Sequence, residues 1–206
     1  MTELGVSARL EPNERRNQII IAADAVLAGR DPAEVTFEEI AEQAGVSRAL
    51  VYNYFGDKGS LLAEVLQRRF QELEDRTRAE IDGDLPPAER FRGVIRLWLE
   101  WARSDSRRLL AGTDHASQHP AVQEVRRQRF AALAVEWGDC PEARLAVTCV
   151  MAVLEAATRD EIENADLDID RMTLVVYTLL WTGVSALDEL GIGPPERRAN
   201  AISLAD

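Results

Sequence analysis

The chain has 206 residues, of which 46% are hydrophobic and 29% charged, a balance typical of a folded protein rather than of a disordered one. Its two cysteines are too few for a disulfide framework or a metal cage, and no stretch reaches the roughly 20 apolar residues of a membrane span. With no apolar leader visible, these features predict a reduced, cytoplasmic protein. The formal net charge of −12 opposes a broadly basic surface, so any DNA contact must rest on a few well-placed donors.

The first part of the chain is predicted to be helical, because apolar residues recur there at helical spacing and capping residues precede them. Thr36 is a good N-cap, and Glu39 three residues later completes a capping box. Ser47 is the N-cap of the next short helix, and a longer helix begins near Lys58. The helices are expected over residues 13–27, 36–43, 47–53 and 58–81.

The remainder of the chain is also predicted to be helical. Gly83, Pro86 and Pro87 mark the clearest break, and the pattern of apolar residues resumes beyond it at helical spacing. No alternating strand pattern of any length occurs, and no internal repeat is visible, so we expect an all-α fold. The further helices are expected over residues 91–102, 120–137, 141–164 and 171–190.

Residues 36–62 have the pattern of a helix-turn-helix. Two short helices that cross at close range need a small residue on the first helix, which Ala41 supplies. The turn between them needs a residue that tolerates positive φ, which Gly45 supplies. The apolar residues expected to fill the wedge between the helices are Ile40, Ala44, Val46 and Val51.

This segment resembles the DNA-binding domain of the TetR family of repressors. The family pattern is roughly T-x-x-x-I-A-x-x-A-G-V-S, followed by a recognition helix that ends in Y-x-Y/H-F and by a Lys that opens the next helix. Gly59 departs from the family, which commonly has an acidic residue there, and beyond about residue 60 the likeness is limited to length and helical character. The matching positions are Thr36, Ile40, Ala41, Ala44, Gly45, Val46, Ser47, Tyr52, Tyr54, Phe55 and Lys58.

The resemblance implies that the helix over residues 47–53 enters the major groove of DNA. Arg48, its only long cation, is the candidate reader of guanine, and Ala49 and Leu50 would contact thymine methyl groups. Lys58, the only lysine of the chain, would bind phosphate at a helix N-terminus. The residues expected to contact DNA are Thr36, Ser47, Arg48, Ala49, Leu50, Tyr52, Asn53, Tyr54 and Lys58.

The second part of the chain holds all four tryptophans and two unusually apolar final helices. The aromatic residues are expected either to line an apolar ligand cavity or to form ordinary core. The apolar helices exceed what one protomer buries, so we expect two helices from each chain to form a four-helix dimer interface, as the resemblance also implies. The cavity candidates are Phe91, Trp98, Trp101, Phe130, Trp137 and Met151. The interface candidates are Val150, Leu154, Val175, Leu179 and Trp181.

Two further patterns have simple interpretations. The only histidines, His115 and His119, stand four residues apart, but no third ligand with suitable spacing follows, so we expect no metal site. Arg126, Arg127 and Arg129 are expected to form a solvated helix face, with a second DNA contact as the alternative.

The sequence therefore predicts a ligand-responsive transcriptional regulator, a repressor that binds a pseudo-palindromic double-stranded operator as a homodimer and is released by a small, mainly apolar effector. Residues 13–62 are the expected DNA-binding head, and residues 63–206 the helical ligand-sensing and dimerisation domain. No cofactor, membrane contact or catalytic residue is expected, because no Ser or Cys motif accompanies the histidines. The alternatives are a small hydrolase and a module that acts through protein partners, the second of which the acidic charge favours.

Overall fold

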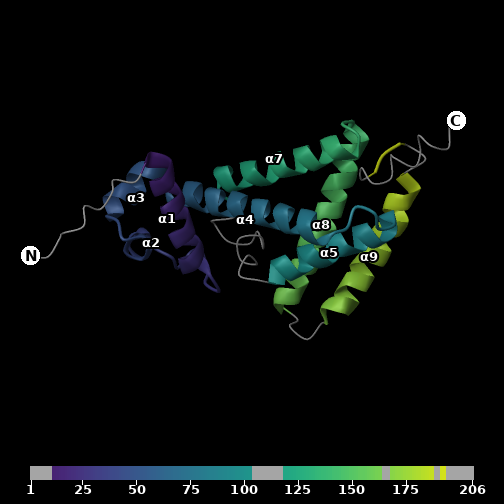
Figure 1. The fold of residues 1–206 in the computed structure, drawn as a ribbon, viewed down its shortest axis with the longest axis horizontal. Helices are drawn as coiled ribbons and strands as arrows, with labels where there is room; N and C mark the ends of the chain where they lie inside the picture. Colours follow the sequence, from purple (N-terminus) through teal and green to yellow (C-terminus); the bar gives the residue numbers. More distant parts are fainter. Residues whose placement is uncertain (1–10, 104–117, 164–167, 188–190, 194–206) are drawn as a thin grey trace, which may run out of the picture.

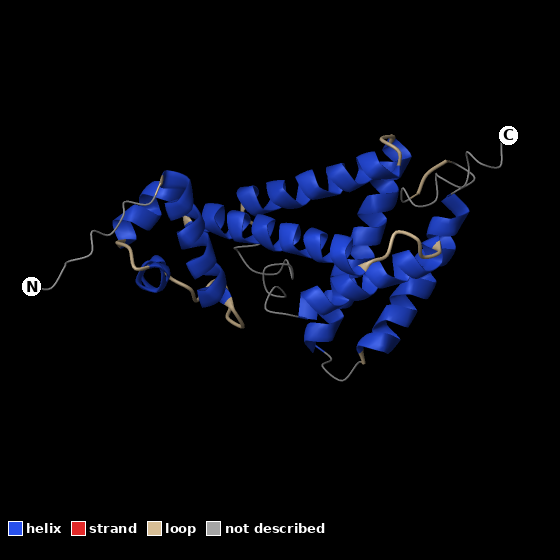
Figure 2. Cartoon of the chain, viewed as in Figure 1, coloured by secondary structure: helices blue, strands red, loops and turns tan. Residues whose placement is uncertain are grey.

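The computed structural model describes residues 11–103, 118–163, 168–187 and 191–193, and within these ranges every regular element is a helix (Figures 1 and 2). This confirms the predicted all-α fold. None of the described helices is long and apolar enough to cross a membrane. The helices are α1 (Pro12–Leu27), α2 (Phe37–Ala44), α3 (Arg48–Phe55), α4 (Lys58–Glu80), α5 (Pro87–Arg103), α7 (Pro120–Trp137), α8 (Pro141–Glu163) and α9 (Ile169–Ala186).

The first three helices form a head at one end of the molecule, seen on the left in Figure 1. α1 packs against both α2 and α4, and α2 packs against α3. Ile19 of α1, Ile40 of α2 and Val51 of α3 are almost completely buried, so one apolar core holds the three helices together. Burial of these side chains stabilises the head by about 1.5–3 kcal/mol each.

The long helix α4 connects the head to the rest of the protein. Its 23 residues span about 35 Å, because an α-helix rises about 1.5 Å per residue. Leu61 and Leu62 are buried in its first half, and Phe70 and Leu73 in its second half. α4 contacts α1 and α3 in the head and α5 and α7 beyond it. The domain division expected at residues 62 and 63 therefore falls inside a continuous helix.

The remaining helices form the larger body of the protein. α5 packs against α4, α8 and α9, and α7 packs against α4 and α8 (Figure 1). An aromatic cluster joins α4 to α5, where the ring of Phe70 stacks on Trp98 and Trp101 at centroid distances of 6.3 and 5.4 Å. The core of the body is thus continuous with that of the head through the buried residues of α4.

Candidate nucleic-acid interface and internal cavity

The turn between α2 and α3 has the geometry that the sequence predicts. Gly45 adopts a left-handed conformation with φ 65° and ends α2, and its N–H donates to the carbonyl of Glu42 at 3.1 Å. The N–H of Val46 donates to the carbonyl of Ala41 at 2.9 Å, which closes the turn. A residue with a Cβ would be strained at this φ, so the glycine is required by the backbone.

Capping residues hold the start of both short helices. The hydroxyl of Thr36 accepts from the N–H of Glu39 at 3.3 Å, and the carboxylate of Glu39 accepts from the N–H of Thr36 at 2.8 Å. These bonds to Thr36, with the guanidinium of Arg30 at 2.8 Å, lower the pKa of Glu39 to about 2. The carboxylate therefore stays charged at neutral pH. Ser47 likewise accepts from the N–H of Leu50 at 3.2 Å and caps α3.

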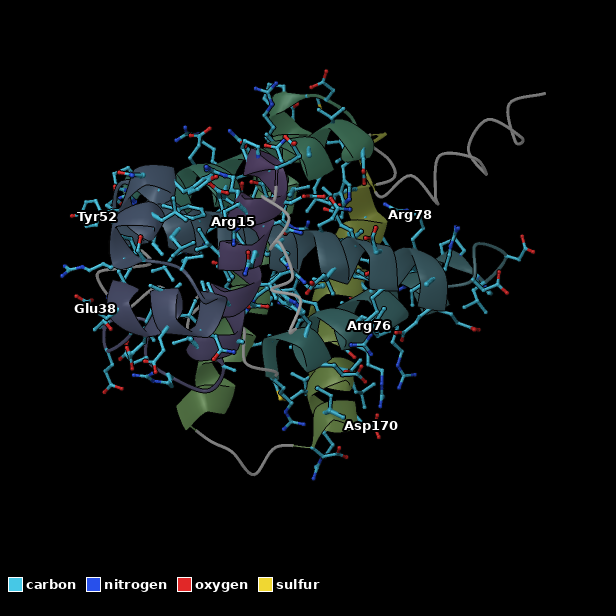
Figure 3. The ribbon with its side chains drawn as sticks, turned by 60° about the vertical axis from the view of Figure 1, so that its left-hand side comes forward. Arg15, Glu38, Tyr52, Arg76, Arg78 and Asp170 are labelled. Atoms are coloured by element: carbon cyan, nitrogen blue, oxygen red, sulfur yellow. The ribbon has the colours of Figure 1, made fainter. Side chains whose placement is uncertain are left out.

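One face of α3 is exposed and carries most of the predicted DNA contacts. Arg48 projects from it, and its guanidinium lies 2.5 Å from the carboxylate of Glu38 on α2. Both side chains are more than half exposed, so water screens this ion pair and the guanidinium is only weakly held. Glu38 and Tyr52 project from the outer side of the head (Figure 3). The exposed candidates are Thr36, Ser47, Arg48, Ala49, Tyr52 and Asn53, whereas Leu50 and Tyr54 are half-buried.

Lys58 has contacts that the sequence did not predict. Its ammonium donates to three backbone carbonyls of the loop between α1 and α2, those of Pro32, Ala33 and Val35, at 2.8, 3.0 and 3.1 Å. A lysine ammonium has three N–H donors, so this set uses all of them. The expected phosphate contact of Lys58 would have to break one of these bonds. In this structure Lys58 instead ties the first turn of α4 to the entrance of α2.

Arg16 of α1 fixes the end of α3. Its guanidinium donates to the carbonyl of Tyr54 at 3.0 Å, pairs with Glu64 of α4 and lies 4.7 Å from the centroid of the Phe55 ring. Gln18 donates to the carbonyl of Ala44 at 2.7 Å. α1 is thus bonded to the last turns of both α2 and α3, which holds the exposed face of α3 in a defined orientation.

A cavity of about 430 Å³ lies in the body between α4, α5, α7 and α8. Of the six cavity candidates, Phe91, Trp98, Trp137 and Met151 line it. Trp101 is buried beside Trp98 without reaching the cavity, and Phe130 of α7 faces a separate, shallower hollow.

The cavity also corrects part of the expected dimer interface. Val150 and Leu154 are buried within the protomer and line the cavity wall, so neither is available to a second chain. Trp181 is half-buried, with its ring 5.7 Å from that of Phe91. Val175 and Leu179 of α9 remain strongly exposed. α8 is apolar on more than one face, as the sequence predicts, but much of its apolar surface faces inward because α8 packs against both α7 and α5.

The prediction of a solvated arginine face on α7 is wrong for two of its three members. Arg126 pairs with Glu155 and Arg129 with Glu74, and both arginines are largely buried, whereas Arg127 is exposed. A sequence signal for Arg129 exists, because it precedes the apolar Leu133 and Trp137 by four and eight residues and so shares their helix face. Arg129 also lines the cavity, but it is not among the predicted cavity residues.

Only one of the two histidines lies among the described residues. His115 lies outside the described residues. His119 is the N-cap of α7, where its ring accepts from the N–H of Ala121 at 3.3 Å. Among the described residues, no group of three or more His, Cys, Asp or Glu side chains is arranged to hold a metal ion.

An exposed face on the second helix of a tightly braced pair is the arrangement of a helix-turn-helix protein. Residues 19–65 match the family of bacterial regulatory proteins described as tetR. The chain is 30% identical over 120 residues to the HTH-type transcriptional activator FasR of Mycolicibacterium smegmatis, a match that covers 57% of this chain and 55% of that protein. The helix-turn-helix of this chain thus matches the model of the TetR family, which confirms the resemblance seen in the sequence.

Solved structures extend the likeness in fold to most of the chain. A tetR-family transcriptional regulator from Streptomyces coelicolor has a TM-score of 0.68 at 24% identity and covers 87% of this chain and 86% of its own. RolR in complex with resorcinol has a TM-score of 0.62 at 20% identity and covers 94% of each chain. This chain spans about half the length of the curated relatives that it matches, including the BetI regulator of Rhizobium meliloti, which is 32% identical over 55% of this chain and 56% of its own length. The proteins named here are described as regulators, in keeping with the prediction that this chain is not an enzyme.

Proposed function

We propose that this chain is a ligand-responsive transcriptional regulator that binds double-stranded operator DNA as a homodimer. The observation that carries the proposal is the continuity of α4. Its first turn is bonded to the head through Lys58, and Leu73, Glu74 and Thr77 in its second half line the cavity. A molecule in the cavity therefore touches the helix on which the head is mounted.

The exposed face of α3 is the proposed surface that reads DNA. Arg48 would read a base edge, Ala49 and Leu50 would contact thymine methyl groups, and Tyr52 and Asn53 would contact phosphates. Thr36, Ser47 and Tyr54 stand around this surface as supporting contacts. We leave Lys58 out of the direct contacts, because its three donors are used within the head.

The proposed dimer interface lies on the exposed apolar face of α9. Leu174, Val175 and Leu179 are each more than half exposed, although they belong to one of the most apolar helices of the chain. Leu145 of α8 is similarly exposed. Exposed apolar residues gathered on one helix mark an interaction site more often than an accident of composition. A symmetric dimer would place two copies of α3 about 34–36 Å apart on a pseudo-palindromic operator.

Release of DNA would follow from a preference of the ligand for one orientation of the heads. A ligand with equal affinity for both orientations shifts nothing, so the cavity must differ between them. Because α4 and α7 both line the cavity and both contact the region of the head, a small shift between these helices would change the spacing of the two copies of α3.

Repression is the proposed sign of regulation, and activation is the second candidate, because FasR is named a transcriptional activator. A gel-shift assay with DNA from upstream of the protein's own gene tests DNA binding. We expect a sequence-specific complex of two chains, with protection of two half-sites one helical turn apart. A reporter fused to that DNA gives the sign. Failure to bind any duplex while capturing a protein partner would support the rival interpretation of a protein-binding module.

A further inference from the structure

We propose that the cavity binds an apolar molecule that carries one carboxylate, and that Arg129 and Trp98 bind this carboxylate. This inference rests on the proposed function and names the chemical class of its effector. The similar structures do not supply that class, because proteins of one fold bind unrelated ligands through different side chains.

Two buried donors in the cavity wall lack a hydrogen-bond partner among the described residues. These are the Nε–H of Arg129 on α7 and the indole Nε1–H of Trp98 on α5. Burial of an unsatisfied polar group is costly, so such groups in a native protein need an explanation. Both groups can only donate. An occupant that satisfies them must therefore present hydrogen-bond acceptors.

The side chains that carry the two donors both pack against Phe70. The guanidinium carbon of Arg129 lies 4.6 Å from the centroid of the Phe70 ring, and the ring of Trp98 stacks on it at 6.3 Å. A carboxylate has two oxygens with about four acceptor sites, so it offers at least as many acceptors as there are unsatisfied donors.

The charge of Arg129 favours an anion over a neutral acceptor. The side chain of Arg129 is only 12% exposed, whereas its partner Glu74 is 43% exposed and Glu136 is also exposed. Burial lowers the pKa of Arg129, although the neighbouring carboxylate of Glu74 opposes the shift. An arginine remains protonated in a protein all the same. Glu74 and Glu136 also line the cavity, but they are the more exposed groups, so the buried charge of the wall is the positive one of Arg129.

Most of the remaining wall is apolar and favours an apolar body, although Thr77 and Arg78 also line it. Ile95, Leu133, Val147 and Met151 line the cavity with the aromatic rings already described. A volume of about 430 Å³ lies within the range of roughly 300–1,000 Å³ that small-molecule sites occupy. A sugar would leave its hydroxyl groups against this apolar wall, and an amine would bring a second cation to Arg129.

Matched probes test the proposal on the full chain. Calorimetric titrations compare decanoate with methyl decanoate, decanol and decylamine, and naphthoate with naphthol, since the shape of the apolar body is not specified. We expect at least one acid to bind about tenfold or more tightly than its ester or alcohol. Arg129→Gln should weaken the binding of that acid by about ten- to a hundredfold and remove the preference for acids. Arg127→Gln, an exposed arginine on the same helix, is the control and should bind the acid normally.

A second pair of variants tests the contribution of the Trp98 indole N–H to binding of the acid. Trp98→Phe removes the Nε1–H and keeps an aromatic ring, so the acid should bind about two- to tenfold more weakly. Trp101→Phe makes the same change outside the cavity and should bind normally. If Arg129→Gln fails to fold, Arg129→Lys keeps the charge without the Nε–H and should bind the acid more weakly than the native chain.

Equal binding of acid and ester, binding of no acid, or a preference for acids that persists in Arg129→Gln would overturn the proposal. DNA binding is measured separately by gel shift without any probe. Loss of the acid preference with intact DNA binding therefore removes only the effector class, whereas absence of DNA binding removes the proposed function.

Discussion

The imidazole of His119 packs directly on Gly59, so that a Cβ built on Gly59 would stand 2.1 Å from the Cγ atom of His119. Gly59 lies in the first turn of α4, beside the head, and His119 caps α7, which lines the cavity. The Nε2 atom of His119 lies 3.4 Å from the carboxylate of Asp57, the N-cap of α4. Gly59, which departs from the family pattern, thus leaves the space that the His119 ring occupies where the start of α7 contacts the start of α4.

Gly59→Ala should push the ring of His119 away and weaken the contact between the N-terminal ends of α4 and α7. Overpacking of this kind costs about 1–3 kcal/mol of unfolding free energy, measured in urea. DNA release by effector should weaken as well. Gly83→Ala is the matched control, because a Cβ there meets nothing within 4 Å. In a His119→Ala background, where the N-cap of α7 is already lost, Gly59→Ala should cost little further stability. A stable Gly59→Ala with normal release would show that the contact transmits nothing.

Arg48→Ala should cost about 1–3 kcal/mol of binding free energy per half-site and relax the preference at one operator position. The reason is that Arg48 is the one long cation on the exposed face of α3. Binding to a panel of single-base operator variants measures both effects. A uniform loss on every sequence would instead identify Arg48 as a phosphate contact.

Glu38→Gln should tighten DNA binding, because it frees the guanidinium of Arg48 and removes a negative charge from the interface. Glu42→Gln on the same helix removes an equal charge without touching Arg48 and is the control. We expect Glu38→Gln to exceed the control by about two- to fivefold in affinity, the range of an exposed ion pair. Equal effects of the two substitutions would mean that Glu38 does not restrain Arg48.

Lys58→Ala should lower the unfolding free energy by about 1–3 kcal/mol, because three carbonyls of the loop lose their donor. DNA affinity should fall on all sequences, because α2 loses its support. The dependence of affinity on salt should not change if Lys58 touches no phosphate. A salt slope lower by about one unit would restore the phosphate contact that the sequence predicts.

Leu179→Glu should shift the chain from dimer to monomer in light scattering, because it places a charge in the proposed apolar interface. We expect a loss of about 2–4 kcal/mol of association free energy. Leu179 is 67% exposed within the protomer, so the fold itself should tolerate the change. Val135→Glu is the control, since Val135 of α7 is 57% exposed and lies on another helix. Dimers of unchanged affinity in Leu179→Glu would exclude α9 from the interface.

Helix positions and the head were predictable because their signals are local. Thr36 with Glu39, Ser47 and Gly45 act within a turn of their own helices, and the structure has them as the sequence predicts. The predicted and observed bounds of α7 coincide, because Pro120 opens it and Gly138 ends it. The last helix begins at Ile169, two residues before its expected start, because Asp168 caps it.

The sequence by itself determined the fold class, the helix-turn-helix and the exposed face of α3, because spacing, caps and turn residues act over a few residues. Only the tertiary structure decided the partners of Lys58, the ring that fills the space over Gly59 and the burial of Arg129. Each of these contacts joins residues that lie more than 20 positions apart in the chain. Which helix packs on which is set by the sum of many weak apolar contacts, and no single residue in a local pattern encodes it.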